Sequence, residues 1–325
     1  LGKNEYIETT RSLVVVTAPG PGSGKMATCI SQLYHDNKRG VKSGYAKFET
    51  FPIWNLPLQH MVNVAYEAAT ADLNDVNMID PYHLEAYGVS TVNYNRDVEI
   101  FPVLKKMFLK IFGEEYYKSP TDMGVNMAGN CIIDDDVCVE ASKQEIIRRY
   151  LTALCDRRND KIGDEVVNKL DVLMQKCNIS VAERKCVNYA KEKSAKTSAP
   201  ATAMELNDGT IITGKTTNLL GATSACILNA LKYLAKINDK VMLLPPSVIE
   251  PISRLKINSF GGHNPRLHTD EVLIALSISA VTDEFADRAI KALPLLKGVQ
   301  CHSSVILSQV DINVLKKLGI DYTSD

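Results

Sequence analysis

The spacing of apolar and polar positions predicts strands and helices in alternation at the start of the chain. Residues 13–16 are four consecutive apolar residues, three of them β-branched, which is typical of a strand covered on both faces. Helical spacing follows over 26–37, and 43–51 returns to a strand pattern. A strand, a helix and a strand in this order form a βαβ unit, so we predict a parallel sheet with a ligand site at its C-terminal edge.

Helical periodicity then predominates up to a linker at 193–200. After it, strands at 203–207 and 210–213 enclose Asn207-Asp208-Gly209, a hairpin signal. Over the whole chain, the same patterns predict further strands at 240–244 and 299–307. They also predict helices at 62–73, 98–112, 137–156, 218–236, 245–255, 269–280, 284–293 and 308–318.

These elements predict an α/β protein in three parts. A P-loop-like domain with a parallel sheet covers residues 1–136, a helical region covers 137–198, and a smaller C-terminal α/β domain covers 199–325. The chain has 325 residues, which is long enough for two or three domains with a sizeable core.

Composition narrows the classes of partner. A formal net charge of −1 argues against a general nucleic-acid binder. No apolar run approaches the ~20 residues of a membrane span. Eight cysteines without a C-x-x-C pair indicate reduced, buried thiols in a cytoplasmic protein rather than a disulfide or zinc framework. We leave open that the chain forms a homo-oligomer. It begins without Met, so we expect it to be cut from a longer protein.

A glycine-rich segment between the first predicted strand and helix is the strongest candidate site. Its glycines let the backbone approach a ligand, the lysine adds a positive charge, and the helix N-terminus aims its N–H groups at the same place. We therefore predict phosphate binding, with ATP and Mg²⁺ as candidate cofactors and zinc disfavoured. The predicted cofactor-binding residues are Gly20, Gly22, Ser23, Gly24, Lys25 and Thr28.

The pattern G-x-x-x-x-G-K-[ST] is imperfect in this segment. Pro19 replaces its first glycine, and Met26 replaces the hydroxyl residue after the lysine. Pro19 and Pro21 also have no N–H to donate. A structural strand-to-helix turn is therefore the alternative to a phosphate loop.

Two acidic segments are candidates for holding Mg²⁺. Residues 134–136 are three aspartates after a short apolar run, although we favour the alternative that they begin a helix. The second segment is a polar loop that carries Asp72, Asp75 and Asp80.

A second glycine motif fits the nucleotide pattern letter for letter at 209–216. Its centre is β-branched and its start is the hairpin signal, so we predict that the fit is accidental. Residues 214–217 still precede a helix and could help to line a site.

A second cluster of chemically active residues lies at 261–271, ahead of a predicted helix. We predict that Arg266 and His268 face an anionic ligand or substrate, with His302 from the last strand near them. With Lys25 these are the candidate catalytic residues. The alternative is a helix capped by Thr269, and no zinc-ligand spacing occurs here.

The chain resembles an uncharacterised bacterial protein family whose members are sometimes labelled ATP-dependent zinc proteases, a label these residues do not support. Members of that family are longer at the N-terminus, and the resemblance implies no established activity. It is carried by Thr17-Ala18-Pro19-Gly20-Pro21-Gly22-Ser23-Gly24-Lys25-Met26-Ala27-Thr28, Lys47-Phe48-Glu49-Thr50-Phe51-Pro52-Ile53-Trp54-Asn55-Leu56-Pro57, Ala68-Ala69-Thr70-Ala71-Asp72-Leu73, Asn264-Pro265-Arg266-Leu267-His268 and His302-Ser303-Ser304-Val305-Ile306-Leu307.

The glycine loop is also similar to that of adenylate-kinase-type enzymes. Those loops lack a hydroxyl residue directly after the lysine and carry a threonine two positions after it. Ala27 fills that position here.

Three functions are consistent with these patterns. The leading hypothesis is an enzyme of transferase or ligase type that uses ATP or another phosphate ligand. The alternatives are a non-catalytic anion-sensing or assembly protein, and a hydrolase or deaminase-like site around His268 and His302.

Overall fold

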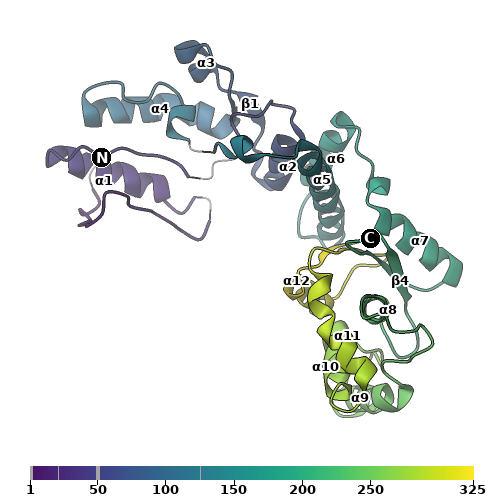
Figure 1. Ribbon diagram of the computed structural model, residues 1–325. Coiled ribbons are helices and arrows are strands. Elements are labelled where there is room, and N and C mark those ends of the chain that lie inside the picture. The colour runs from purple at the N-terminus through teal and green to yellow at the C-terminus, as the bar shows by residue number, and fades with distance from the viewer. Residues whose placement is uncertain (1–2, 21, 49–51, 125) are drawn as a thin grey trace. The chain divides into compact units, whose positions relative to one another are not determined.

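The computed structural model describes residues 3–20, 22–48, 52–124 and 126–325. Contacts divide the chain into two compact units, Leu1–Lys143 and Gln144–Asp325, which are described separately (Figure 1). The three-part division at residues 136 and 198 stays a prediction. Among the described helices, none combines the length and apolar character needed to cross a bilayer.

The first unit is built mainly of helices. The predicted helices at 26–37, 62–73 and 98–112 are confirmed to within a few residues at each end. The elements of this unit are α1 (Lys25–Lys38), α2 (Met61–Ala69), β1 (Asn77–Ile79), α3 (Pro81–Tyr87), β2 (Val92–Tyr94), α4 (Asn95–Phe112) and the start of α5 (Asp135–Arg158), with 3-10 turns at Ala71–Leu73, Thr121–Met123 and Ala128–Cys131.

The core of the first unit lies between α1 and α4. Ile30 and Leu33 of α1 pack in one cluster with Phe101, Leu104 and Phe108 of α4. The apolar residues of α4 recur at three- and four-residue intervals, so they form one stripe along the helix. This stripe fixes α1, and with it the glycine loop that precedes α1.

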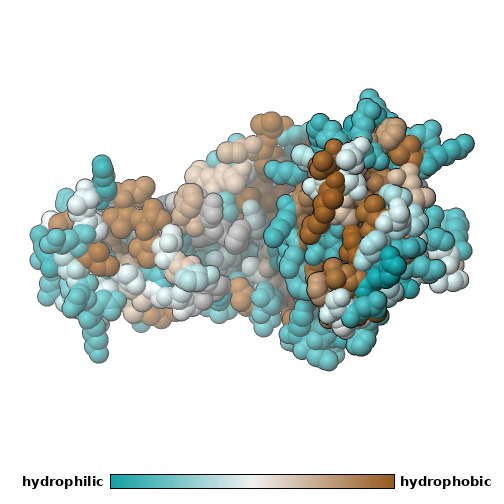
Figure 2. Space-filling view, turned by 90° about the horizontal axis from the view of Figure 1, so that it is seen from below, coloured by the Kyte–Doolittle hydropathy of each residue, from teal (hydrophilic) through white to brown (hydrophobic). Residues whose placement is uncertain are grey.

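The strand predicted over residues 13–16 is wrong. The chain forms no strand there, and Leu13 and Val15 have 80% and 73% of their surface exposed. A β-branched run favours a strand, but a strand also needs a neighbour and covered faces, which the described residues do not supply here. Figure 2 shows apolar side chains at the surface of this unit, at the left.

The parallel-sheet, P-loop-like domain is not confirmed. In the described parts of the first unit, the paired strands are β1 and β2, which run antiparallel with Met78 opposite Asn93. The predicted strand at 43–51 is reduced to one bridge between Lys47 and Gly124, and its last three residues lie outside the described residues. The coarser prediction, a mixed α/β chain, is confirmed.

The second unit contains a four-stranded sheet of order β4-β3-β5-β6. Strand β3 pairs antiparallel with β4 and β5, whereas β5 and β6 are parallel. The predicted hairpin is confirmed, the strand at 240–244 is wrong, and β6 was not predicted. The elements are β3 (Ala201–Glu205), β4 (Ile211–Lys215), β5 (Gln300–Ser303) and β6 (Asp321–Ser324), with helices α6 (Asp164–Lys176), α7 (Lys185–Thr197), α8 (Ala222–Leu234), α9 (Pro246–Asn258), α10 (Thr269–Ser279), α11 (Glu284–Lys291) and α12 (Gln309–Lys317).

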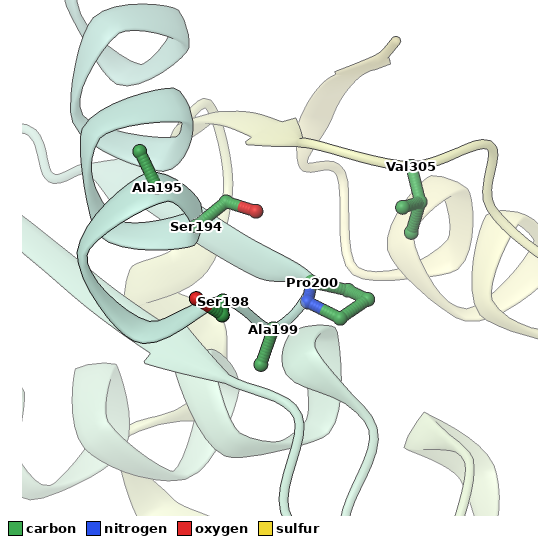
Figure 3. Close-up of a pocket in the computed structure, with 6 residues that line it drawn as sticks. All are labelled: Ser194, Ala195, Ser198, Ala199, Pro200 and Val305. Carbon is green, nitrogen blue, oxygen red and sulfur yellow. The ribbon is translucent and has the colours of Figure 1, made fainter.

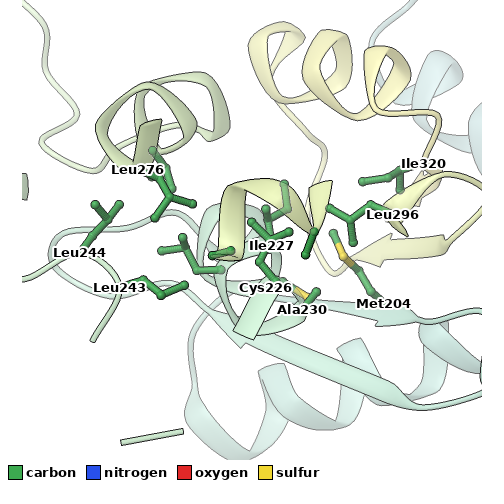
Figure 4. Close-up of a cluster of buried hydrophobic side chains, with 14 of the residues drawn as sticks. Met204, Cys226, Ile227, Ala230, Leu243, Leu244, Leu276, Leu296 and Ile320 are labelled. Carbon is green, nitrogen blue, oxygen red and sulfur yellow. The ribbon is translucent and has the colours of Figure 1, made fainter. Parts of the chain in front are cut away.

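Helices α7 and α8 cover opposite faces of this sheet. Ala203 of β3 packs against Cys186 of α7, whereas the next residue, Met204, packs in the cluster that contains Cys226 of α8. Successive strand residues point to opposite faces, so the two helices lie on different sides. Figure 4 shows the larger cluster, in which the α8 side chains Ile227 and Leu231 are fully buried.

Gly214 of β4 lies directly against the backbone of α8. A Cβ atom at this position would lie 2.2 Å from the backbone nitrogen of Cys226 and 2.7 Å from the carbonyl oxygen of Ala222. The second glycine of the letter-perfect motif therefore serves strand–helix packing, and its preceding residues form the confirmed hairpin. The prediction that this motif is accidental agrees with this geometry.

We expect Gly214→Ala to lower the free energy of unfolding of the second unit by about 2 kcal/mol or more, because backbone cannot move aside as a flexible side chain can. Urea denaturation followed by circular dichroism measures this change. Gly221→Ala is the matched control, because its Cβ meets the nearest atom at an ordinary 3.6 Å. Equal midpoints for the two variants would contradict the packing role of Gly214.

Candidate functional site

The glycine loop ahead of α1 depends on two residues with left-handed backbone. Gly22 has a φ of +72° and Gly24 a φ of +87°, and nothing lies within 4 Å of where their Cβ atoms would be. Only glycine adopts this conformation without steric cost. Gly22, Ser23 and Gly24 are exposed, so their backbone is accessible to a ligand.

Lys25 folds back onto the loop. Its ammonium donates to the carbonyl oxygen of Gly20 at 2.8 Å and to the hydroxyl of Ser23 at 3.2 Å. The hydroxyl of Ser23 donates in turn to the same carbonyl oxygen. The positive charge is thus held by neutral oxygens, which an anion can replace.

The N-terminus of α1 presents backbone donors that no described side chain caps. Gly24 is the N-cap residue, and the first turn contains no acidic residue. The first N–H groups of a helix have no partner within the helix, and they carry partial positive charge. Lys25 and this N-terminus therefore bring positive charge to one place.

Thr28 and Met26 make structural contacts, unlike the hydroxyl residue that follows the lysine in a nucleotide loop. The amide of Thr28 donates to the carbonyl oxygen of Gly24 at 3.0 Å, so it is already part of the helix. Met26 is partly buried against the cluster of α1 and α4. The loop therefore places its polar residues at 23 and 25, and an apolar one at 26.

Two aspartates of the second acidic segment, Asp75 and Asp80, make structural contacts. The fully buried Asp80 accepts from the amides of Tyr82 and His83 at the start of α3, and from the amide and hydroxyl of Thr121. Asp75 accepts from Arg96 at 2.7 Å.

Residues 134–136 lie at the start of α5, as the favoured alternative predicts. Asp134 accepts from the amide of Val137, and Asp135 lies 2.9 Å from Nε2 of His60. In the part of the chain that the structure describes, no group of three or more His, Cys, Asp and Glu residues is placed to hold a metal ion.

Arg266 and His268 lie together in the loop before α10, and the contacts of both residues stabilise this loop. Nε of Arg266 donates to the carbonyl oxygen of Thr217 at 2.8 Å. The backbone amide of His268 donates to Glu271 at 2.8 Å, and its Nδ1 lies 3.4 Å from a carboxylate oxygen of Asp311. These contacts agree with the alternative of a capped helix, although the N-cap residue is His268 rather than Thr269.

Asp311 is the residue at this place that sequence reasoning missed. Its carboxylate accepts from the amide and hydroxyl of Thr269 and from the hydroxyl of Ser308. The Ser-x-x-Asp spacing at 308–311 predicts the local cap of α12. No local pattern predicts the contact with Thr269, which is 42 residues away.

His302 lies elsewhere in the second unit. It is fully buried on β5, where Nδ1 lies 2.9 Å from the hydroxyl of Thr323 and Nε2 lies 3.5 Å from the carboxylate of Asp325. Burial lowers the pKa of His302, against the opposing effect of Asp325. No described hydrogen bond or ion pair joins His302 to Arg266 or His268, and Lys25 belongs to the first unit.

A shallow cavity of about 340 Å³ lies between α7 and the segment after β5 (Figure 3). None of the predicted site residues lines it. Its lining contains two hydroxyl groups and no titratable side chain, so it offers neither an acid nor a base: Ser194, Ala195, Ser198, Ala199, Pro200 and Val305.

Comparison with known proteins supports the resemblance stated from the sequence. Residues 1–178 match the N-terminal domain of unknown function DUF1846, and residues 182–325 match the corresponding C-terminal domain. The chain is 57% identical over 325 residues to a UPF0371 protein of Streptococcus pneumoniae, covering 100% of this chain and 66% of the relative. A UPF0371 protein of Corynebacterium urealyticum is 57% identical over 324 residues, with 100% and 65% covered.

The chain thus spans about two thirds of the length of these curated relatives. The alignments run over the whole of this chain, and the expectation that it is cut from a longer protein stays a prediction. The relatives' printed names give no activity that could be carried over.

We expect the stability of the folded chain to depend on pH through the protonation of His302. Its pKa is lower in the folded chain than the ordinary value of 6.5, so the unfolded chain binds the proton first as pH falls. The native state therefore holds its full stability above about 6.5 and loses part of it as pH falls towards the lowered pKa.

Thermal melting at pH 7.5 and 5.5 measures this loss. His302→Gln should reduce the difference between the two melting temperatures, whereas the exposed His263, changed to Gln, should leave it as in the wild type. An unchanged difference in His302→Gln would contradict the assignment.

Proposed function

We propose that this chain, which belongs to the DUF1846 family of unknown function, binds a small phosphate-bearing ligand at Gly22, Ser23, Gly24 and Lys25. One observation carries the proposal. Within the described residues, the hydrogen-bond partners of the Lys25 ammonium are neutral oxygens of its own loop, beside a helix whose first turn contains no acidic residue.

Electrostatics supports an anion at this place. A lysine contributes one positive charge, and a helix N-terminus contributes roughly half a charge more. Phosphate oxygens accept hydrogen bonds from backbone amides and from an ammonium group, and charged hydrogen bonds are stronger than neutral ones. A phosphate group would replace Gly20 and Ser23 as the acceptor for Lys25.

The position of Lys25 also suits phosphoryl or acyl-phosphate chemistry. A cation at the bound phosphate stabilises the negative charge that develops during transfer, which is the main contribution of the protein in such reactions. This supports an enzyme of transferase or ligase type that uses a phosphate ligand.

A non-catalytic anion sensor is the second candidate. The engagement of Asp75 and Asp80 in structural contacts favours it, because both carboxylates were candidate ligands for Mg²⁺. A loop that binds phosphate without a neighbouring acid or base would report the ligand rather than transform it.

We expect Lys25→Met to weaken the binding of a phosphate ligand by about 10- to 100-fold, the equivalent of one charged hydrogen bond. Titration calorimetry with ATP, GTP and pyrophosphate on the full chain measures the affinity. Lys42→Met is the matched control, since Lys42 is an exposed lysine of the same unit. Equal binding heats for wild type and Lys25→Met would contradict the proposed site.

Phosphate release from ATP, with and without a cell extract as the source of a second substrate, separates the two candidates. Turnover that is lost in Lys25→Met supports the enzyme. Lys25-dependent binding without turnover under either condition supports the sensor.

A further inference from the structure

We infer that the loop takes a single phosphate group without a divalent cation, so that the ligand class is a phosphate monoester or inorganic phosphate rather than a magnesium–nucleoside triphosphate. The inference rests on the proposed function and narrows it. Its evidence is the identity and packing of the residues that follow Lys25.

The position after the lysine offers no ligand for Mg²⁺. Loops of the pattern G-x-x-x-x-G-K-[ST] place a serine or threonine hydroxyl there, and that hydroxyl coordinates the metal. In this chain the position is Met26, whose side chain packs against the apolar cluster that contains Ile30 and Leu33. Mg²⁺ requires oxygen ligands, and a thioether is too soft to replace one.

The next two positions do not restore the missing hydroxyl at the loop. Ala27 has none. Thr28 begins the second turn of α1, where its amide is bonded to Gly24. At the ordinary rise of a helix, Thr28 lies about 4.5 Å further along the axis than Lys25, away from the N-terminal opening.

The charge at the loop fits one phosphate group. Lys25 and the helix N-terminus together supply about 1.5 positive charges. A phosphate monoester carries about 1.5 to 2 negative charges near pH 7. A triphosphate carries roughly twice that charge, and enzymes that bind it balance the excess with a metal ion.

Two of the candidate carboxylates of the first unit are engaged in contacts within the described part of the chain. Asp80 uses both oxygens to join the start of α3 to Thr121, and Asp75 is paired with Arg96. Met26 is therefore the residue that we expect to decide between the two classes of ligand.

The test measures the affinity of the full chain for inorganic phosphate, AMP and ATP, each in EDTA and in excess Mg²⁺. We expect phosphate or AMP to bind with the same affinity, within about twofold, in both conditions, and ATP to gain nothing from Mg²⁺. Tighter binding of AMP would assign an organic ester, and tighter binding of phosphate would assign the free ion.

Two variants of residue 26 make the test specific. Met26→Thr restores a hydroxyl, so we expect Mg²⁺ to strengthen its binding of ATP by roughly tenfold or more. Met26→Leu keeps an apolar side chain and should behave as the wild type. Thermal melting of both variants checks that the cluster of α1 and α4 remains folded.

The possible failures are distinguishable. Wild-type binding of ATP that is tenfold or more tighter in Mg²⁺ than in EDTA, and is lost in Lys25→Met, overturns this inference and leaves the proposed function standing. Folded Met26→Thr that gains no dependence on Mg²⁺ contradicts the role of Met26. Binding that is absent in all conditions, or equal in wild type and Lys25→Met, overturns the proposed function and this inference with it.

Discussion

The left-handed backbone at Gly22 and Gly24 is the constraint on which the candidate site depends. A residue with a Cβ atom would cost roughly 1–2 kcal/mol at each position, so the turn favours glycine at both. Gly24, the second of these residues, directly precedes Lys25, where α1 begins. The local conformation therefore brings a cation and a set of free backbone donors to one place.

Packing then fixes the direction in which this N-terminus points. Met26, Ile30 and Leu33 of α1 lie against the apolar stripe of α4, so the same helix that presents donors at its start is anchored along its side. A site built on a packed helix holds its donors in place before a ligand arrives, which reduces the entropy that binding must overcome. The apolar residue at 26 belongs to this anchor, and this is why the loop gains a rigid base and lacks a metal-binding hydroxyl.

The two glycine motifs of the chain show that context decides what such a pattern does. Gly22 and Gly24 have positive φ angles and open space around them, as a ligand-binding turn requires. Gly214 lies against the backbone of Cys226, where a side chain has no room. The imperfect pattern thus has the geometry of a binding loop, and the perfect pattern has that of a packed strand.

Sequence predicted the local elements better than the contacts between distant residues. The helices were predictable because their apolar stripes repeat at helical spacing, and the hairpin because Asn207-Asp208-Gly209 permits a tight turn. Residues 13–16 have the composition of a strand, but pairing depends on neighbours that composition does not reveal. The short, polar strand β6 lacks an apolar pattern, and it forms because β5 lies beside it.

The candidate site residues also divide into those that a local sequence signal predicts and those whose contacts are with distant residues. Lys25 and its glycines were found because a lysine after a glycine-rich turn is a local signal. Arg266, His268 and His302 were grouped on chemical type alone, and their partners are Thr217, Asp311 and Thr323. Each of these contacts joins residues more than 20 positions apart, so none could be predicted from local spacing.

At the proposed site, the backbone of residues 22–27 receives the phosphate group. Backbone amide chemical shifts of the isotope-labelled full chain, followed during titration with inorganic phosphate, test it most directly. We expect the largest shifts at Gly22, Ser23, Gly24 and the first turn of α1. Shifts confined to the starts of α8 and α10, with those of Gly22 to Lys25 unchanged, would contradict it.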